Sequence, residues 1–176
     1  MDTTSCEMRF AMELPPDRGA LIRPQFRTGI LCLCEGIAGF DQSMQLVNQV
    51  RATSGCAGAQ KFGSYWVRGQ SPIPPGVYKV DTTMLTATES KKVPMGTNYF
   101  HIEPDPIINS DDPRLIRTEI CLHYDGGALG TAGCIGVQPR RYATEPGWYV
   151  VLGWVLRMRE KGFKSIPLSV SYEQGA

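Results

Sequence analysis

Short stretches in which apolar and polar residues alternate recur along this chain, and most of them end at glycine or proline. Alternation with a period of two is typical of a β-strand that turns one face to the core. Glycine and proline commonly end such strands. The sequence therefore predicts a mainly β fold, with strands over 7–14 (EMRFAMEL), 29–36 (GILCLCEG), 64–67 (SYWV), 76–80 (GVYKV), 97–105 (TNYFHIEPD), 117–125 (RTEICLHYD) and 165–173 (SIPLSVSYE).

Two segments have a helical pattern. In 145–162 (EPGWYVVLGWVLRMREKG), Glu145 and Pro146 suit a first helical turn and Gly162 suits a stop. An apolar stripe runs along this segment at the spacing of one helix face, through Trp148, Val151, Leu152, Val155 and Leu156. We expect one amphipathic helix near the C-terminus. A possible short helix lies near 41–53 (DQSMQLVNQVRAT), with Asp41 as its N-cap.

The length and charge of the chain limit the number of domains and the kinds of partner that it can have. A chain of 176 residues fits a single domain over 1–176, in which 1–59 supply N-terminal strands and the short helix. The net charge of +1 and the absence of long like-charge runs argue against nucleic acid as a partner. WYVVLGWVLRM is too short for a membrane span. No signal peptide is evident, so we expect synthesis in the cytoplasm.

Six cysteines are spread through the chain, at positions 6, 32, 34, 56, 121 and 134. Without a secretion signal, free thiols are expected rather than disulfides. Cys32 and Cys34 resemble half of a zinc site, but two histidines and no CxxC pair leave few further ligands. We therefore expect no metal and interpret this pair as small fillers on one strand face.

One stretch, HYDGGALGTAGCIG at 123–136, joins a histidine to a cysteine. Strand alternation puts His123 on the face opposite Leu122, and the glycines after Asp125 allow the chain to turn back, so that Cys134 can face His123. An imidazole beside a thiol can take its proton and return it to a leaving amine. The backbone amides of Gly133 and Cys134 would then form an oxyanion hole. The alternative is an inert cysteine in a glycine-rich loop beside a structural histidine.

These residues resemble the active-site signature of L,D-transpeptidase (YkuD-like) catalytic domains, in which a histidine precedes a [ST]-x-G-C-[IV] element. Thr131, Gly133, Cys134 and Ile135 match that element, and His123 takes the place of the histidine. A second motif, SPIPPGVYKV at 71–80, is similar to a proline-rich strand that precedes the catalytic region in the family; the matching residues are Pro72, Pro74, Gly76, Tyr78 and Val80. The resemblance covers 60–172 and is nearest to short-loop members in secreted effectors and phages.

The resemblance implies a β-sandwich or curled mixed sheet with a cysteine nucleophile and no organic or metal cofactor. Cys134 would attack a peptidoglycan stem peptide, forming a thioester that an amine or water resolves, and His123 would act as base and then acid. Such an enzyme would work in the periplasm or cell wall after delivery by a phage or a secretion machine. Its expected partners are stem peptides, together with a delivery apparatus, a virion or an immunity protein.

The chain departs from the family at three positions near the cysteine. Ala132 stands where many members have histidine, Gly136 where they have arginine, and Tyr124 where glycine commonly follows the histidine. Without that arginine, the charge for a substrate carboxylate would come from Arg117, Arg140 or Arg141. Tyr124 and Thr131 are further candidates for substrate binding, and His101 for the cleft wall. The alternative function is a catalytically silent structural or interaction protein, such as a virion or secretion-apparatus component.

Overall fold

The computed structural model describes residues 3–15, 26–37, 43–86, 98–125, 130–137 and 147–175. Its strands are β1 (Thr3–Leu14), β2 (Gly29–Ile37), β3 (Gln45–Cys56), β4 (Gly76–Asp81), β5 (Leu85–Thr86), β6 (Asn98–Glu103), β7 (Ile107–Ile108), β8 (Ile116–Arg117), β9 (Cys121–Tyr124), β10 (Gly130–Val137) and β11 (Ser165–Gln174). A helix, α1 (Gly147–Glu160), lies between β10 and β11. The prediction of a mainly β fold is confirmed.

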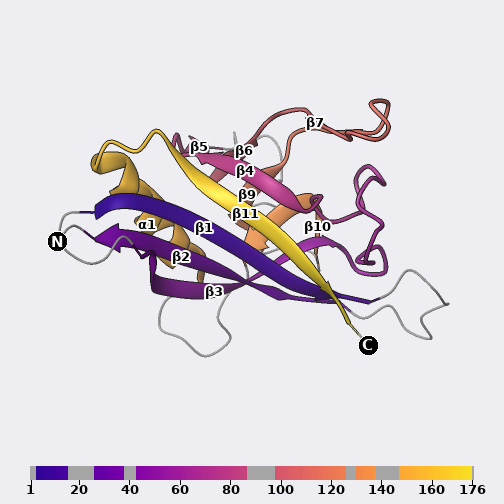
Figure 1. The fold of residues 1–176 in the computed structure, drawn as a ribbon, viewed down its shortest axis with the longest axis horizontal. Coiled ribbons are helices and arrows are strands. Elements are labelled where there is room, and N and C mark those ends of the chain that lie inside the picture. Colours follow the sequence, from indigo (N-terminus) through magenta and orange to yellow (C-terminus); the bar gives the residue numbers. More distant parts are fainter. Residues whose placement is uncertain are drawn as a thin grey trace.

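The main sheet is mixed and closes on itself. Its strand order is β4-β11-β1-β2-β3-β10-β9-β6-β5, and β4 also pairs with β6, which joins the two sides. Two neighbouring pairs are parallel, β1 with β11 and β9 with β10. Figure 1 shows the long strands β1, β2 and β11 running beside one another, with the short β7 and β8 in a separate arm. Strands from both ends of the chain are therefore integral to one sheet.

Alternation along the strands decides which side chains fill the interior. In β1, Met8, Phe10 and Met12 are buried while the residues between them are exposed. In β9 and just before it, Leu122 and Ile120 join the core, so the predicted strand parity around His123 is confirmed. Full burial of one such side chain stabilises the fold by about 1.5–3 kcal/mol. The face opposite the core is thereby left for the candidate site.

Helix α1 forms where the sequence predicts the C-terminal helix. Trp148, Val151 and Val155 of the predicted stripe are buried against the core, and Trp154 and Met158 are buried beside them. Leu152 and Leu156 of the predicted stripe are only half-buried, so the buried face is displaced toward Trp154 and Met158. Among the described residues, no helix combines the length and apolar character needed to cross a membrane.

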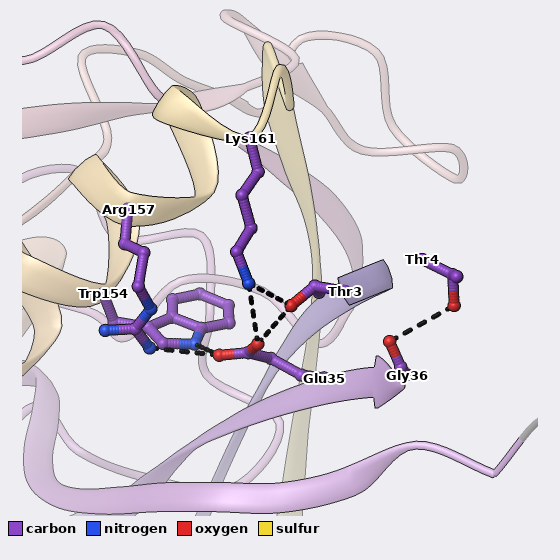
Figure 2. Close-up of polar contacts among 7 residues, drawn as sticks. All are labelled: Thr3, Thr4, Glu35, Gly36, Trp154, Arg157 and Lys161. Carbon is purple, nitrogen blue, oxygen red and sulfur yellow. Dashed lines mark hydrogen bonds and ion pairs between the residues drawn. The ribbon is translucent and has the colours of Figure 1, made fainter. Parts of the chain in front are cut away.

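A buried carboxylate ties α1 to the first two strands (Figure 2). Glu35 on β2 accepts hydrogen bonds from the Trp154 indole N–H at 2.7 Å and from the Arg157 guanidinium at 3.1 Å. The Thr3 hydroxyl donates to its other oxygen at 2.6 Å, and the Lys161 ammonium lies 3.7 Å away. Burial by itself raises the pKa of Glu35, but the bonds from Thr3, Arg157 and Trp154 outweigh it and hold the pKa below its usual value. This carboxylate is therefore ionised and structural.

Two expected elements differ from the structure. The possible helix near 41–53 is wrong, because residues 45–56 form strand β3. Leu46 and Val47, which suit a helix face, are 56% and 42% exposed, and pairing with β2 and β10 decides the conformation. The stretch 64–67 is not a strand either: it lies in an irregular connection where Ser64 N–H donates to the Lys61 carbonyl.

Candidate active site

Cys134 and His123 lie on neighbouring parallel strands. Ile135 of β10 is paired with Leu122 of β9, and Gly136 with His123, so Cys134 is one diagonal step from the histidine. The two side chains interact closely enough that each shifts the pKa of the other. Both residues are almost completely buried, at 6% and 3% exposure. The turn expected from the glycines after Asp125 lies partly outside the described residues, but the structure places the two residues on adjacent strands.

A wide bulge in β10 carries the cysteine. Gly130 pairs with Cys56 and Ile135 with Ser54, so two residue steps along β3 face five along β10. The segment 131–134 therefore leaves the ladder, and Gly133 adopts a φ of 114°, a conformation that residues with a side chain rarely take. This bulge frees backbone groups next to Cys134 for other contacts.

Three consecutive carbonyls of the bulge are each held by a side chain. Arg117 donates to the Ala132 carbonyl at 3.1 Å, the Ser54 hydroxyl to the Gly133 carbonyl at 3.1 Å, and the Thr131 hydroxyl to the Cys134 carbonyl at 2.5 Å. In a trans peptide the N–H points opposite to the carbonyl. The amides of Gly133 and Cys134 therefore point away from Arg117 and Ser54, and their role as an oxyanion hole stays a prediction.

Arg117 and Ser54 also connect the bulge to the proline-rich motif. Arg117 donates to the carbonyls of Ser71 and Pro72 at 3.1 and 3.3 Å. The Ser54 hydroxyl, in turn, accepts the Ile73 N–H at 2.9 Å. The two motifs that are distant in sequence are thus joined by two shared side chains. Within the second motif, the Tyr78 hydroxyl donates to the Pro74 carbonyl at 2.8 Å, which fixes the bend before β4.

The position of Arg117 gives it a structural task. It is 1% exposed, and its remaining bond goes to the Tyr65 carbonyl at 2.6 Å. Burial lowers its pKa, because a charged guanidinium is less well solvated there than in water. Its four hydrogen bonds in the described part of the chain all go to backbone carbonyls. This geometry favours support of the bulge over the expected contact with a substrate carboxylate; Arg140 and Arg141 lie outside the described residues.

The imidazole of His123 is oriented by its own strand. Its Nδ1 lies 2.8 Å from the Tyr124 carbonyl oxygen, which can only accept, so Nδ1 carries a proton. Nε2 is then the nitrogen that is left to act as a base. Burial lowers the pKa of His123, but the contact with Cys134, the Tyr124 carbonyl and Asp125 raise it above its usual value. The charged form is thus favoured.

The sulfur of Cys134 lies beside Cys121. The Cys121 N–H donates to it at 3.3 Å. The interaction with the Cys121 thiol, followed by that with His123, lowers the pKa of Cys134 well below its usual value although burial opposes it. The interaction with Cys134 and burial raise the pKa of Cys121. The arrangement favours a Cys134 thiolate beside a His123 imidazolium.

An unusual backbone conformation at Glu119 borders the two sulfurs. Glu119 has a φ of 58°, and its N–H donates to the Asp105 carboxylate at 3.2 Å. Its carbonyl oxygen lies 3.6 Å from the Cys121 sulfur and 3.7 Å from that of Cys134. A protonated thiol at either position therefore has an acceptor. Left-handed conformations of non-glycine residues are uncommon and often occur at functional sites.

The other expected site residues serve mainly in support. Thr131 is buried and accepts the Gly55 N–H as well as holding the bulge. The Tyr124 side chain packs against the core, and only its carbonyl contacts His123. At Gly136, a Cβ atom would lie 2.6 Å from the Thr131 Cγ2, so an arginine there would clash. His101 lies on the same sheet face as Cys121, with Nδ1 3.6 Å from its sulfur.

Two contributors were not predicted as site residues, Ser54 and Cys121. Cys121 shares the predicted face of His123, so the alternation that orients the histidine also pointed to it. No sequence motif pointed to Ser54, because it comes directly after the segment 41–53 that was interpreted as a possible helix. In the described part of the chain, no group of three or more histidine, cysteine or acidic residues is arranged to hold a metal ion.

Comparisons with known proteins give no assignment. No protein-family model, curated protein or solved structure matches this chain. Any function must therefore be argued from the site itself.

Proposed function

We propose that this protein is a cysteine acyltransferase or hydrolase of the L,D-transpeptidase type, acting on peptidoglycan stem peptides through a thioester. The observation that carries the proposal is the placement of Cys134 on the strand next to His123, whose imidazole is oriented by a backbone carbonyl. A thiolate with an adjacent imidazolium is the arrangement that activates a cysteine for attack on a carbonyl.

The proposed reaction uses each part of the site. The Cys134 sulfur attacks the carbonyl carbon of the substrate peptide, and the oxyanion binds the amides of Gly133 and Cys134. His123 gives its proton to the leaving amine, and the tetrahedral species collapses to a thioester. His123 then takes a proton from water or an acceptor amine, which attacks the thioester and releases Cys134. Water gives hydrolysis, and an amine gives transfer.

The choice of substrate rests on the two motifs. The TAGCI element and the SPIPPGVYKV segment carry the resemblance to L,D-transpeptidases, and Arg117 and Ser54 bind both segments in the structure. A curled mixed sheet with adjacent cysteine- and histidine-bearing strands supports the same fold type. Because Arg117 is committed to backbone carbonyls, recognition of the substrate carboxylate is assigned in this proposal to Arg140 or Arg141.

The direct test is incubation of purified protein with disaccharide-tetrapeptide muropeptides, followed by mass spectrometry. Loss of the terminal D-alanine indicates hydrolysis, and its exchange for an added D-amino acid indicates transfer. Cys134→Ala is expected to abolish either product, whereas Cys56→Ala, at a cysteine outside the pair, is expected to retain it. Unchanged muropeptides with folded wild-type protein, or equal turnover by Cys134→Ala, would refute the proposal.

A second candidate, a silent structural or interaction protein, is favoured by two observations. Cys134 and His123 are nearly inaccessible, and the β7–β8 arm exposes the apolar side chains of Ile108, Leu115 and Ile116. Iodoacetamide labelling near pH 6 separates the candidates. An activated Cys134 is expected to react faster than Cys56, whose pKa is raised by burial. Equal labelling of the two would favour the silent protein.

A further inference from the structure

Cys121 and Cys134 occupy neighbouring positions on two adjacent parallel strands. Ile135 pairs with Leu122, and one step back along both strands brings Cys134 beside Cys121. The Cys121 N–H bond to the Cys134 sulfur, at 3.3 Å, confirms this proximity. Adjacent strands lie about 4.8 Å apart, within the Cα separation of about 4.4–6.8 Å that a disulfide spans. The contact between the Cys121 N–H and the Cys134 sulfur places the two residues close enough for such a bond to be tested.

The two side chains also share a face of the sheet. Leu122, next to Cys121, points into the core, as does Ile135 next to Cys134. Both sulfurs are therefore on the same face, where they lie 3.6 and 3.7 Å from the same Glu119 carbonyl oxygen. All six cysteines of the chain are free. Those on β1 and β2 face other residue types across the ladder: Cys6 pairs with Glu35, Cys32 with Arg9 and Cys34 with Glu7.

A third group completes the arrangement on the side of Cys121. His101 on β6 pairs with Cys121 across the sheet, and its Nδ1 is 3.6 Å from the sulfur. His101 is partly exposed and lines an open cleft of about 670 Å³, together with Lys79, Asp81 and Glu103. His101 therefore lies between this cleft and the Cys121 sulfur.

We propose that Cys134 and Cys121 form a reversible redox pair, in which Cys134 reacts with a small hydroperoxide and Cys121 resolves the product as a disulfide. This goes beyond acyl transfer, because it needs only the two sulfurs and their neighbours. If the proposed function also holds, the disulfide blocks the nucleophile and makes acyl transfer dependent on reducing conditions.

The two steps balance in atoms and electrons. The Cys134 thiolate attacks a peroxide oxygen: an S–O bond forms, the O–O bond breaks, and the released alkoxide or hydroxide takes the His123 proton. Sulfur loses two electrons and the peroxide gains them, leaving a sulfenic acid. The Cys121 sulfur then attacks the sulfenic sulfur: an S–S bond forms, the S–O bond breaks, and hydroxide leaves as water with the Cys121 proton. A dithiol reductant reverses the oxidation by exchange.

The experiment is disulfide mapping after exposure of the folded protein to a small excess of hydrogen peroxide. Alkylation and trypsin digestion give one peptide, residues 118–140, that contains both cysteines. We expect this peptide to be lighter by two hydrogens and unalkylated, and chymotryptic cleavage between the cysteines to leave its halves joined. Dithiothreitol should restore two alkylation sites. A fully alkylated peptide after peroxide would overturn the proposal.

Variants test the division of roles. Cys121→Ser is expected to accumulate a sulfenic acid on Cys134, seen as a several-fold higher yield of the dimedone adduct than in wild type. Cys56→Ser, the matched control, should form the disulfide normally. Equal dimedone yields in wild type and Cys121→Ser would show that Cys121 does not resolve Cys134. Muropeptide turnover by the reduced protein is measured in a separate assay. Absence of turnover refutes only the proposed acyl transfer, and absence of the disulfide refutes only the proposed redox pair.

Discussion

Gly133→Ala tests whether the bulge beside Cys134 is held as described. A Cβ atom at this position would lie 1.8 Å from the Arg117 Nη2 and 3.3 Å from the Ile120 Cδ1. Arg117 has little room to retreat, because it is 1% exposed and bonded to four carbonyls. The substitution must therefore displace either the guanidinium or the bulge.

The expected magnitude has two parts. A residue with a side chain at a φ of 114° is strained by about 1–3 kcal/mol. Overpacking against a buried guanidinium costs about 1–3 kcal/mol more. We expect the free energy of unfolding to fall by about 4 kcal/mol, and Tm by about 8–16 °C for a chain of this size.

Urea denaturation followed by tryptophan fluorescence measures the loss. The matched control is Gly69→Ala, because Gly69 has a φ of 74° but no atom within 4 Å of its hypothetical Cβ. It carries backbone strain without the clash, so it should cost about 1–3 kcal/mol less than Gly133→Ala. In an Arg117→Ala background, the cost of Gly133→Ala should drop by a similar amount. Equal costs at both glycines, or no coupling to Arg117, would refute this account of the bulge.

Three further outcomes follow from single contacts. Glu35→Gln should lower the free energy of unfolding by about 1–3 kcal/mol near pH 7. The folded-state pKa of Glu35 is below its usual 4.5, so the stabilisation by the ionised carboxylate is fully present above pH 4.5. This stabilisation is lost as the pH falls through the folded-state pKa. Denaturant titrations down to about pH 3 should therefore show the stabilities of wild type and variant converging. Ser54→Ala leaves the Gly133 carbonyl and the Ile73 N–H without a partner, and should cost about 1–3 kcal/mol in urea denaturation. Gly136→Arg, which restores the arginine of the resembled family, should lower Tm and leave muropeptide turnover no higher, because its Cβ would contact Thr131; a stable variant with greater turnover would contradict this packing.

Local pattern was enough to predict most strands, the helix and the direction of His123. Alternation around Leu122 depends on neighbouring residues alone, and the core imposes the same period of two on β1 and β11. The segment 45–53 failed because its apolar residues fit a helix as well as a strand. Only pairing with the preceding strand β2 and with the distant β10 decides between the two.

The roles of the residues that support the candidate site could not be predicted from local sequence patterns. Arg117 was predicted near the cysteine, but as a ligand for a carboxylate; its four carbonyl partners come from three separate segments. Ser54 contacts both motifs only because a wide bulge turns a carbonyl toward it. Such contacts follow from tertiary pairing, which a single sequence does not show.

The parallel pair of β1 and β11 has a consequence for folding kinetics. It joins Met8 to Leu168, so the two strands meet only after a loop of about 160 residues has closed. Closing such a loop costs about 4–5 kcal/mol of chain entropy before the strands gain any contact. Contacts between residues so far apart in the sequence raise the relative contact order. Domains with a high relative contact order typically fold in milliseconds to seconds. Once this seam is made, opening it again separates β11 from β1 and breaks the closed circuit of strands.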